Sequence, residues 1–210
     1  MVNNKTLIFV AVLAVAFAAL NSYIVMQKAS QIAQANQLTG LTGSEGYVNV
    51  TVAVGISVNF TKDAVSWGVG SINGGESNVT LVVADGTGTS VTRGNWSTTG
   101  ITPLSIVNLG NVNATLSLST TKNATTLFGG SAGHRAYRWN ITNSDSGSCN
   151  PTAFSNATFI DVNTSGYSFC SQFGFVDSQD QVNISILLTV PYDGNTGALT
   201  DTITATVAAA

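Results

Sequence analysis

The chain has 210 residues, of which 44% are hydrophobic and only 8% are charged, and its formal net charge is −3. Ordinary soluble domains carry roughly 25% charged residues, so Ser, Thr, Asn and Gly supply most of the polar positions here, as is typical of cell-surface and fibre proteins. The seven basic residues are scattered singly and form no cationic stripe for a phosphate backbone, which argues against nucleic acid as a partner.

The N-terminal region contains an uninterrupted apolar run, LIFVAVLAVAFAAL, at residues 7–20. It can be a secretory signal with a small-x-small cleavage site at Ala16-Phe17-Ala18, cleaved at Ala18. It can also be a retained helix, because residues 7–26 at 1.5 Å each would cross roughly 30 Å of hydrocarbon. Good helix formers continue to about Gln37, before LTGLTGSEG ends the pattern, and this continuation favours the retained helix.

The order of a hydrophobic helix, a polar continuation and a β-rich head resembles archaeal type IV pilins and archaellins. The run LIFVAVLAVAFAAL followed by QKAS is similar to their N-terminal helix. The resemblance implies a helix that packs into a filament core. We therefore expect residues 1–37 to form a hydrophobic helix (a membrane or filament-core anchor, or a signal peptide), 38–46 a Gly/Thr linker, and 47–210 a β-sandwich domain.

From residue 47 onwards the apolar residues recur with a period of two. The alternation from Val48 to Phe60 predicts one long, half-buried strand. Further alternating runs are separated by turn signals such as NGG at 73–75 and DGN at 193–195. These runs are Val65, Trp67, Val69; Val79, Leu81, Val83; Leu104, Ile106; Val112, Ala114, Leu116, Leu118; Tyr137, Trp139, Ile141; Val182, Ile184, Ile186, Leu188, Val190; and Ile203, Ala205, Val207.

Strands that are apolar on one face only must bury that face against a second sheet. The sequence therefore predicts a mainly β fold: an Ig-like or jelly-roll β-sandwich preceded by one long N-terminal hydrophobic α-helix. In the stretch PLSIVNLGNVNATLSL, Asn108 and Gly110 are predicted to turn the chain between two strands. The last strand could be an edge to which another chain adds a strand.

Three stretches of the head, SVNFTKDAVSWGVGSI, PLSIVNLGNVNATLSL and LLTVPYDGNTGALTDTITATV, resemble archaeal surface β-sandwich proteins. In outline they are similar to the camelysin-type biofilm fibre proteins of bacteria. The resemblance implies a structural surface protein and brings no catalytic residue with it.

Two cysteines, Cys149 and Cys170, lie 21 positions apart and form either one disulfide or two buried thiols. A structural zinc site would need four ligands, and the only histidine is His134, so we favour the disulfide. A disulfide requires an oxidising compartment, which indicates an extracellular location.

Many Asn-x-Ser/Thr sequons point to the same location, although an Asn- and Thr-rich chain produces some of them by chance. Besides one at Asn4, the candidate glycosylation sites are Asn49, Asn59, Asn78, Asn95, Asn113, Asn123, Asn140, Asn156, Asn163 and Asn183.

The segment DVNTSG carries the strongest signal for a ligand site. Asp161, Asn163 and Ser165 occupy positions 1, 3 and 5 of a calcium loop, and Gly166 occupies position 6. Position 12 is Gln172 instead of the bidentate Glu, so calcium is a weak prediction and an Asx-rich turn is the alternative. No other cofactor is expected.

Nothing in the sequence predicts an enzyme. His134 lies in a Gly-rich loop, no HExxH motif is present, and no spacing singles out a pair of carboxylates. Four aromatic residues could stack on sugars, although core packing is the simpler interpretation. They are Trp67, Trp96, Trp139 and Tyr192.

The expected function is a structural subunit of an extracellular filament, pilus or surface layer. It would self-associate into a polymer, attach to the membrane through its N-terminal helix and use no small-molecule substrate. The alternative is a secreted or membrane-anchored β-sandwich binding module, such as an adhesin or a glycan-binding protein.

Overall fold

The structure is a computed structural model that describes residues 17–24, 50, 53–152 and 158–210. The chain divides into two units, residues 1–52 and 53–210. In the first unit, residues 17–24 are α-helical. Within the residues described, no helical segment has the length and hydropathy that crossing a bilayer requires. Most of the predicted N-terminal helix, and all of the predicted linker, lie outside the described residues.

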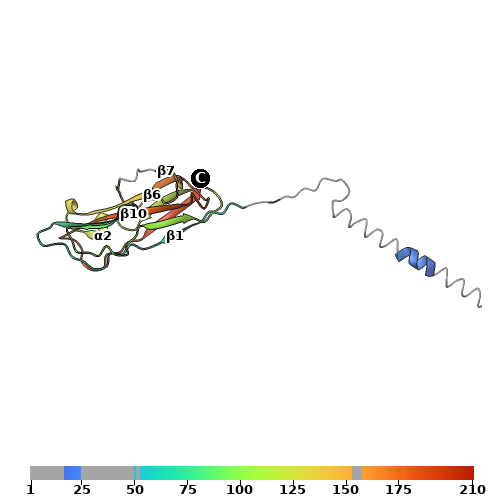
Figure 1. The fold of residues 1–210 in the computed structure, drawn as a ribbon, viewed down its shortest axis with the longest axis horizontal. Helices are drawn as coiled ribbons and strands as arrows, with labels where there is room; N and C mark the ends of the chain where they lie inside the picture. The colour runs from blue at the N-terminus through green and yellow to red at the C-terminus, as the bar shows by residue number, and fades with distance from the viewer. Residues whose placement is uncertain (1–16, 25–49, 51–52, 153–157) are drawn as a thin grey trace, which may run out of the picture. The chain divides into compact units, whose positions relative to one another are not determined.

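The second unit is built from two antiparallel sheets (Figure 1). The seven-stranded sheet contains β1 (Val58–Lys62), β2 (Asn78–Ala84), β3 (Gly88–Thr92), β4 (Leu104–Asn108), β6 (Ala136–Asn143), β8 (Ile160–Asp161) and β10 (Gln181–Pro191). The four-stranded sheet has the order β11 (Ile203–Ala209), β5 (Ala114–Thr120), β9 (Tyr167–Phe173) and β7 (Cys149–Thr152). Two short helical turns, α2 (Ala124–Phe128) and η1 (Ala132–His134), lie between β5 and β6. The prediction of a mainly β fold is confirmed.

Strand β10 organises the larger sheet. Along one edge it pairs with β6, and along the other it pairs first with β4 and then, from Ile186, with β2. The strand is long enough, at 11 residues, to hold two shorter partners end to end on the same edge. Its alternation places Val182, Ile184 and Ile186 in the core, as their period of two predicted.

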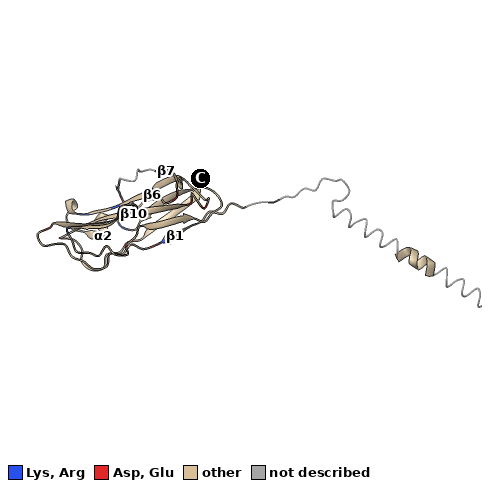
Figure 2. Ribbon diagram, in the orientation of Figure 1, with Lys and Arg blue, Asp and Glu red and all other residues tan. Residues whose placement is uncertain are grey.

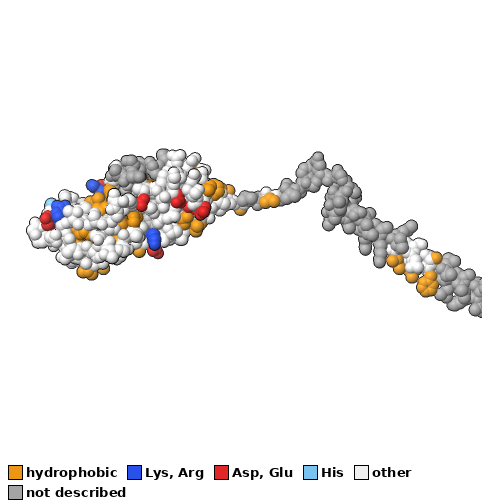
Figure 3. All heavy atoms as spheres, in the orientation of Figure 1, with side chains coloured by type: hydrophobic (Ala, Val, Ile, Leu, Met, Phe, Trp, Pro, Cys, Tyr) orange, Lys and Arg blue, Asp and Glu red, His pale blue; other side chains and the backbone are white. Residues whose placement is uncertain are grey.

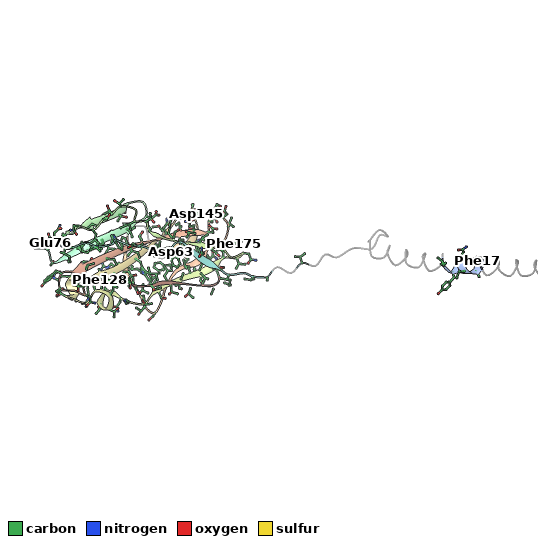
Figure 4. All side chains as sticks on the ribbon, turned by 90° about the horizontal axis from the view of Figure 1, so that it is seen from below. Phe17, Asp63, Glu76, Phe128, Asp145 and Phe175 are labelled. Atoms are coloured by element: carbon green, nitrogen blue, oxygen red, sulfur yellow. A yellow bond between two sulfur atoms is a disulfide. The ribbon has the colours of Figure 1, made fainter. Side chains whose placement is uncertain are left out.

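The core lies between the two sheets and contains residues from both (Figure 4). From the larger sheet, Trp139 and Ile141 are fully buried, and from the smaller one Leu116, Leu118 and Phe173 are fully buried. The rings of Trp139 and Phe169 meet edge to face across the core, with centroids 5.4 Å apart. Edge-to-face pairs stabilise a fold by roughly 0.5–1.5 kcal/mol beyond the contribution of the apolar area that they bury.

Two predicted strands differ from the structure. Strand β1 begins only at Val58, and residues 53–57 of the expected long strand form no ladder, while most of its earlier residues lie outside the described ones. The run from Val65 to Val69 is not a strand either: Gly68 has a φ of 67°, and Val69 is 98% exposed. A positive φ reverses the direction of the chain and breaks the alternation that a strand needs.

The predicted turn between β4 and β5 is confirmed, and it joins the two sheets. Asn108 is 2% exposed, and its Nδ2 donates to the carbonyl oxygens of Val112 and Phe173, each at 3.2 Å. Residues 53–57 are held to this turn by both backbone and side-chain hydrogen bonds. The N–H groups of Leu109 and Asn111 donate to the carbonyls of Ser57 and Gly55, at 2.8 and 3.0 Å. Asn111 Oδ1 accepts from the Gly55 N–H at 2.7 Å, and its Nδ2 donates to the Ala53 carbonyl at 2.9 Å. This turn is therefore architectural.

Candidate functional site

The predicted disulfide is present between Cys149 and Cys170, with Cα atoms 5.2 Å apart. It links β7 to β9, which are neighbours in the smaller sheet, and both cysteines are buried. The alternative of two buried thiols is thereby excluded.

The predicted calcium loop is one of the connections between the two sheets. Strand β8 ends at Asp161, and β9 begins at Tyr167. The carboxylate of Asp161 forms an ion pair with Arg138, whose Nε lies 2.8 Å from Oδ1. The Oδ1 of Asn163 accepts from the Ser165 N–H at 2.7 Å, which is an Asx turn. Two of the predicted ligand oxygens are therefore already engaged, and no cluster of three or more metal-ligating side chains occurs in the described parts of the chain.

The same loop borders a shallow hollow of about 610 Å³. Its other wall is Asn123, the residue that caps α2. Asn123 Oδ1 accepts from the Thr126 N–H, and Thr126 Oγ1 accepts in turn from the Asn123 N–H, both at 2.9 Å. This reciprocal pair is a capping box, which fixes the Asn123 side chain. The hollow is lined by Asn123, Ile160, Asp161, Val162, Asn163, Thr164 and Tyr167.

Sequence reasoning identified Asp161 and Asn163 as site residues but missed that Asn123 and Tyr167 join them. The sequence NATT could have predicted Asn123 as a helix cap, because Asn followed three residues later by Thr can form such a capping box. The meeting of Asn123 with a loop 40 residues later depends on how the two sheets pack, and no local pattern encodes that.

A second cavity, of about 650 Å³, lies at the border between the two sheets. Trp67, Trp96 and Phe128 contribute to its walls. The Trp96 ring packs against Gly70, where an added Cβ would lie only 2.2 Å from the indole. Of the four aromatic residues considered for sugar stacking, Trp139 is a core residue, Tyr192 is 65% exposed, and the other two line this cavity.

Tyr137 and Asp201 also line the second cavity. Burial raises the pKa of the Tyr137 phenol well above its ordinary value, and the negative charge of Asp201 raises this pKa further. A hydrogen bond to Asp201 acts in the same direction, and Thr121 Oγ1 donates to Oδ1 of this carboxylate. The phenol therefore stays neutral at physiological pH.

The only histidine lies near a carboxylate and a serine, but the arrangement is not a catalytic relay. Ser131 donates directly to Asp193, with Oγ 2.6 Å from Oδ2, and its N–H also binds this carboxylate. These hydrogen bonds hold the pKa of Asp193 below its ordinary value. A relay would need the histidine between the serine and the carboxylate. His134 instead ends the short turn η1.

The candidate glycosylation sites differ in exposure. Asn78 and Asn140 are only 7% and 2% exposed, so their amides face the protein interior and do not fit a glycan in this fold. Asn49 and Asn156 lie outside the described residues. Asn183 is half-buried, and the exposed candidates are Asn59, Asn95, Asn113, Asn123 and Asn163.

Strand β11 forms one edge of the smaller sheet, and no described strand pairs with its outer side. Thr202 and Ala210 hydrogen-bond across to the β5 side. In an antiparallel pair, successive residues alternate between hydrogen-bonding to the partner strand and pointing their N–H and C=O groups away from it. Since Thr202 and Ala210 bond toward β5, the backbone groups that point away from β5 are those of Ile203, Ala205, Val207 and Ala209. The strand, ITATVAA, contains neither a charged residue nor a proline.

Charged side chains are sparse in the described parts of the chain (Figure 2). Lys, Arg, Asp and Glu are spread thinly along the described chain (Figure 2), and on the face drawn in Figure 3 they lie singly or in small groups among uncharged polar residues. No family model matches the sequence, and neither a curated protein nor a solved structure matches it.

Proposed function

We propose that this protein is a structural subunit of an extracellular filament, pilus or surface layer. The β-sandwich, of Ig-like or jelly-roll type, would face outward, and the N-terminal apolar segment would anchor it in a membrane or a filament core. The buried disulfide supports an oxidising, extracellular location. The exposed sequons support glycosylation of the outward face.

The observation that carries this proposal is the outer edge of β11. Monomeric proteins protect edge strands with charged side chains, prolines or bulges, because unpaired backbone groups recruit strands from other chains. β11 has seven residues and none of these charged or proline guards. Its outward backbone groups would accept a strand from a second copy, and main-chain hydrogen bonds would supply the affinity.

A proline at an outward position tests this edge. Ala205→Pro removes an N–H that points away from β5, and prolines are tolerated at such positions of edge strands. We expect the full-length variant to keep its melting temperature but to remain monomeric in size-exclusion chromatography and electron micrographs. Thr206→Ala is the matched control, because it changes an exposed side chain of the same strand and keeps every outward N–H.

The outcomes separate the parts of the proposal. Filaments of wild type and Thr206→Ala, but not of Ala205→Pro, are the expected result. Equal filaments from all three proteins would contradict the role of the β11 edge. If wild-type protein at high concentration forms no polymer, the structural function itself is wrong.

A second candidate function is a surface-anchored binding module, such as an adhesin or a glycan-binding protein. The observation that favours it is the hollow at Asn123, Asp161, Asn163 and Tyr167, where polar side chains are fixed beside an aromatic ring. It is compatible with the structural role, because the hollow and the outer edge of β11 use different residues.

A further inference from the structure

The hollow brings together two segments that are distant in sequence: Asn123, which caps α2, and the continuous stretch from β8 to the first residue of β9. The turn is tied to β5 as well, because the Thr120 N–H donates to the Asn163 carbonyl at 3.2 Å. The walls of the hollow are therefore held in place by the fold, and a ligand would not have to order them. Pre-ordered walls reduce the entropic cost of binding.

Two amide groups of the hollow have a fixed orientation. Asn123 and Asn163 each use Oδ1 to accept a backbone N–H, at 2.9 and 2.7 Å. Neither Nδ2 group makes a hydrogen bond to a described residue, and both side chains are exposed. Since a primary amide carries two N–H donors on Nδ2, the hollow presents two fixed donor groups to solvent.

A carboxylate and an aromatic ring complete the hollow. Arg138 binds Asp161 through Oδ1, and the Asp161 side chain remains 78% exposed, so Oδ2 is available as an acceptor. The Tyr167 ring is half-buried and meets the ring of Phe169 edge to face, at a centroid distance of 5.0 Å. This contact fixes the plane of the Tyr167 ring. The lining thus offers donors, an acceptor and an apolar ring side by side.

We propose that this hollow is a recognition site for a neutral saccharide. A pyranose has hydroxyl groups that both donate and accept hydrogen bonds, and a face of C–H groups that packs on an aromatic ring, which matches the lining. An anionic ligand would meet the Asp161 carboxylate, and a metal ion would meet amide N–H donors and the Arg138 charge. The proposal deepens the second candidate function, on which it rests.

The saccharide can come from two sources, and the sequence provides the means to separate them. Asn123 and Asn163 are themselves sequon residues, so a glycan attached to either would occupy the hollow. Thr125→Ala and Ser165→Ala remove both sequons and leave both asparagines in place. The experiments therefore use the full chain with these two changes as the parent protein.

Binding is measured by NMR titration of the side-chain amides with chitobiose and methyl glucopyranoside, with glucuronic acid as the anionic comparison. We expect the neutral sugars to shift the Asn123 and Asn163 amide signals. Asn163→Asp keeps the Asx-turn oxygen but removes the donor, and should weaken binding about three- to tenfold, as the loss of one hydrogen bond predicts. Asn123→Asp should act alike.

Asn95→Asp is the matched control. Asn95 is also exposed and its Oδ1 also accepts a backbone N–H, from Ser71 at 2.6 Å, but it lies outside the hollow. The variant adds the same charge and should leave affinity unchanged. Tyr167→Phe keeps the ring and should bind, whereas Tyr167→Leu should not; melting curves establish that each variant is folded.

A glycan released from the native protein serves as a further probe. If it binds, recognition operates between subunits; if only the foreign sugars bind, the source is external, and either result supports the site. The proposal is overturned if no neutral sugar binds at millimolar concentration, or if Asn163→Asp and Asn95→Asp bind equally well. Because none of these changes touches β11, filament formation would be unaffected, and the two proposals can fail separately.

Discussion

Reducing the Cys149–Cys170 disulfide should destabilise the head by a predictable amount. The two cysteines are 21 positions apart. Closing a loop of about 20 residues stabilises the folded state by roughly 3 kcal/mol, because the cross-link lowers the entropy of the unfolded chain. For a domain of this size, each kcal/mol corresponds to about 2–4 °C in melting temperature, so we expect a decrease of roughly 6–12 °C.

The assay is thermal unfolding of the full chain followed by circular dichroism, with and without reductant. Reduction keeps both sulfur atoms, so it leaves no cavity where the side chains were. The double variant Cys149→Ala with Cys170→Ala should melt lower still, because both side chains are buried and their truncation leaves voids. Identical melting of oxidised and reduced protein would refute the argument, since the loop would then be constrained equally without the bond.

Three further predictions concern buried polar groups. Asn108→Ala should lower the free energy of unfolding in urea by about 1–3 kcal/mol, because the variant leaves buried backbone groups without partners. Burial, and then the charge of Asp145, raise the pKa of Asp180. The stability that Asp180 contributes is therefore present in acid and is lost as pH rises through the raised pKa. Asp180→Asn should melt at a higher temperature than wild type at neutral pH, but not in acid. Asp201→Asn should lower the pKa of Tyr137 in an ultraviolet titration, and burial should still keep this pKa above its ordinary value.

Alternation predicted the strands that face the core. The runs around Leu81, Leu116, Trp139 and Ile184 became β2, β5, β6 and β10, because each has one face that only a second sheet can bury. The turn at Asn108 was also predictable, since Asn and Gly between two alternating runs have few other roles.

Other elements could not be predicted from local patterns. Strands β3, β7, β8 and β9 were missed: β3 is rich in Gly, Ser and Thr, and β8 has only two residues. Pairing with a neighbour, and not an apolar face, makes β3 and β8 strands, whereas β9 buries Phe169 and Phe173 without a regular alternation. Conversely, the alternating residues before Val58 looked like a strand, but the described ones among them form no regular ladder and are bound to the turn at 109–111 by backbone groups and by the Asn111 side chain.

The chemistry of the hollow could not be predicted from local sequence patterns either. Its carboxylate and one amide stood out in the sequence as calcium ligands, because oxygen-bearing side chains at alternate positions are what calcium needs. The ion pair with Arg138 changes that chemistry, and Arg138 lies 23 residues before Asp161 in the sequence. The identity of a site thus depends on partners that the tertiary fold supplies.

The hollow and the β11 edge are close enough to influence each other. Tyr167 lies opposite Leu118 on β5, and Leu118 lies opposite Ala205 on β11. At about 4.8 Å per strand, Tyr167 is roughly 10 Å from Ala205 and about 15 Å from a strand added by a neighbouring subunit. A glycan on that neighbour could span this distance, so assembly would raise the local concentration of saccharide at the hollow. The monomeric Ala205→Pro variant should then retain the intrinsic affinity of the hollow for free sugar. A glycan from a neighbouring subunit should shield the Asn163 amide from solvent only in assembled wild-type protein.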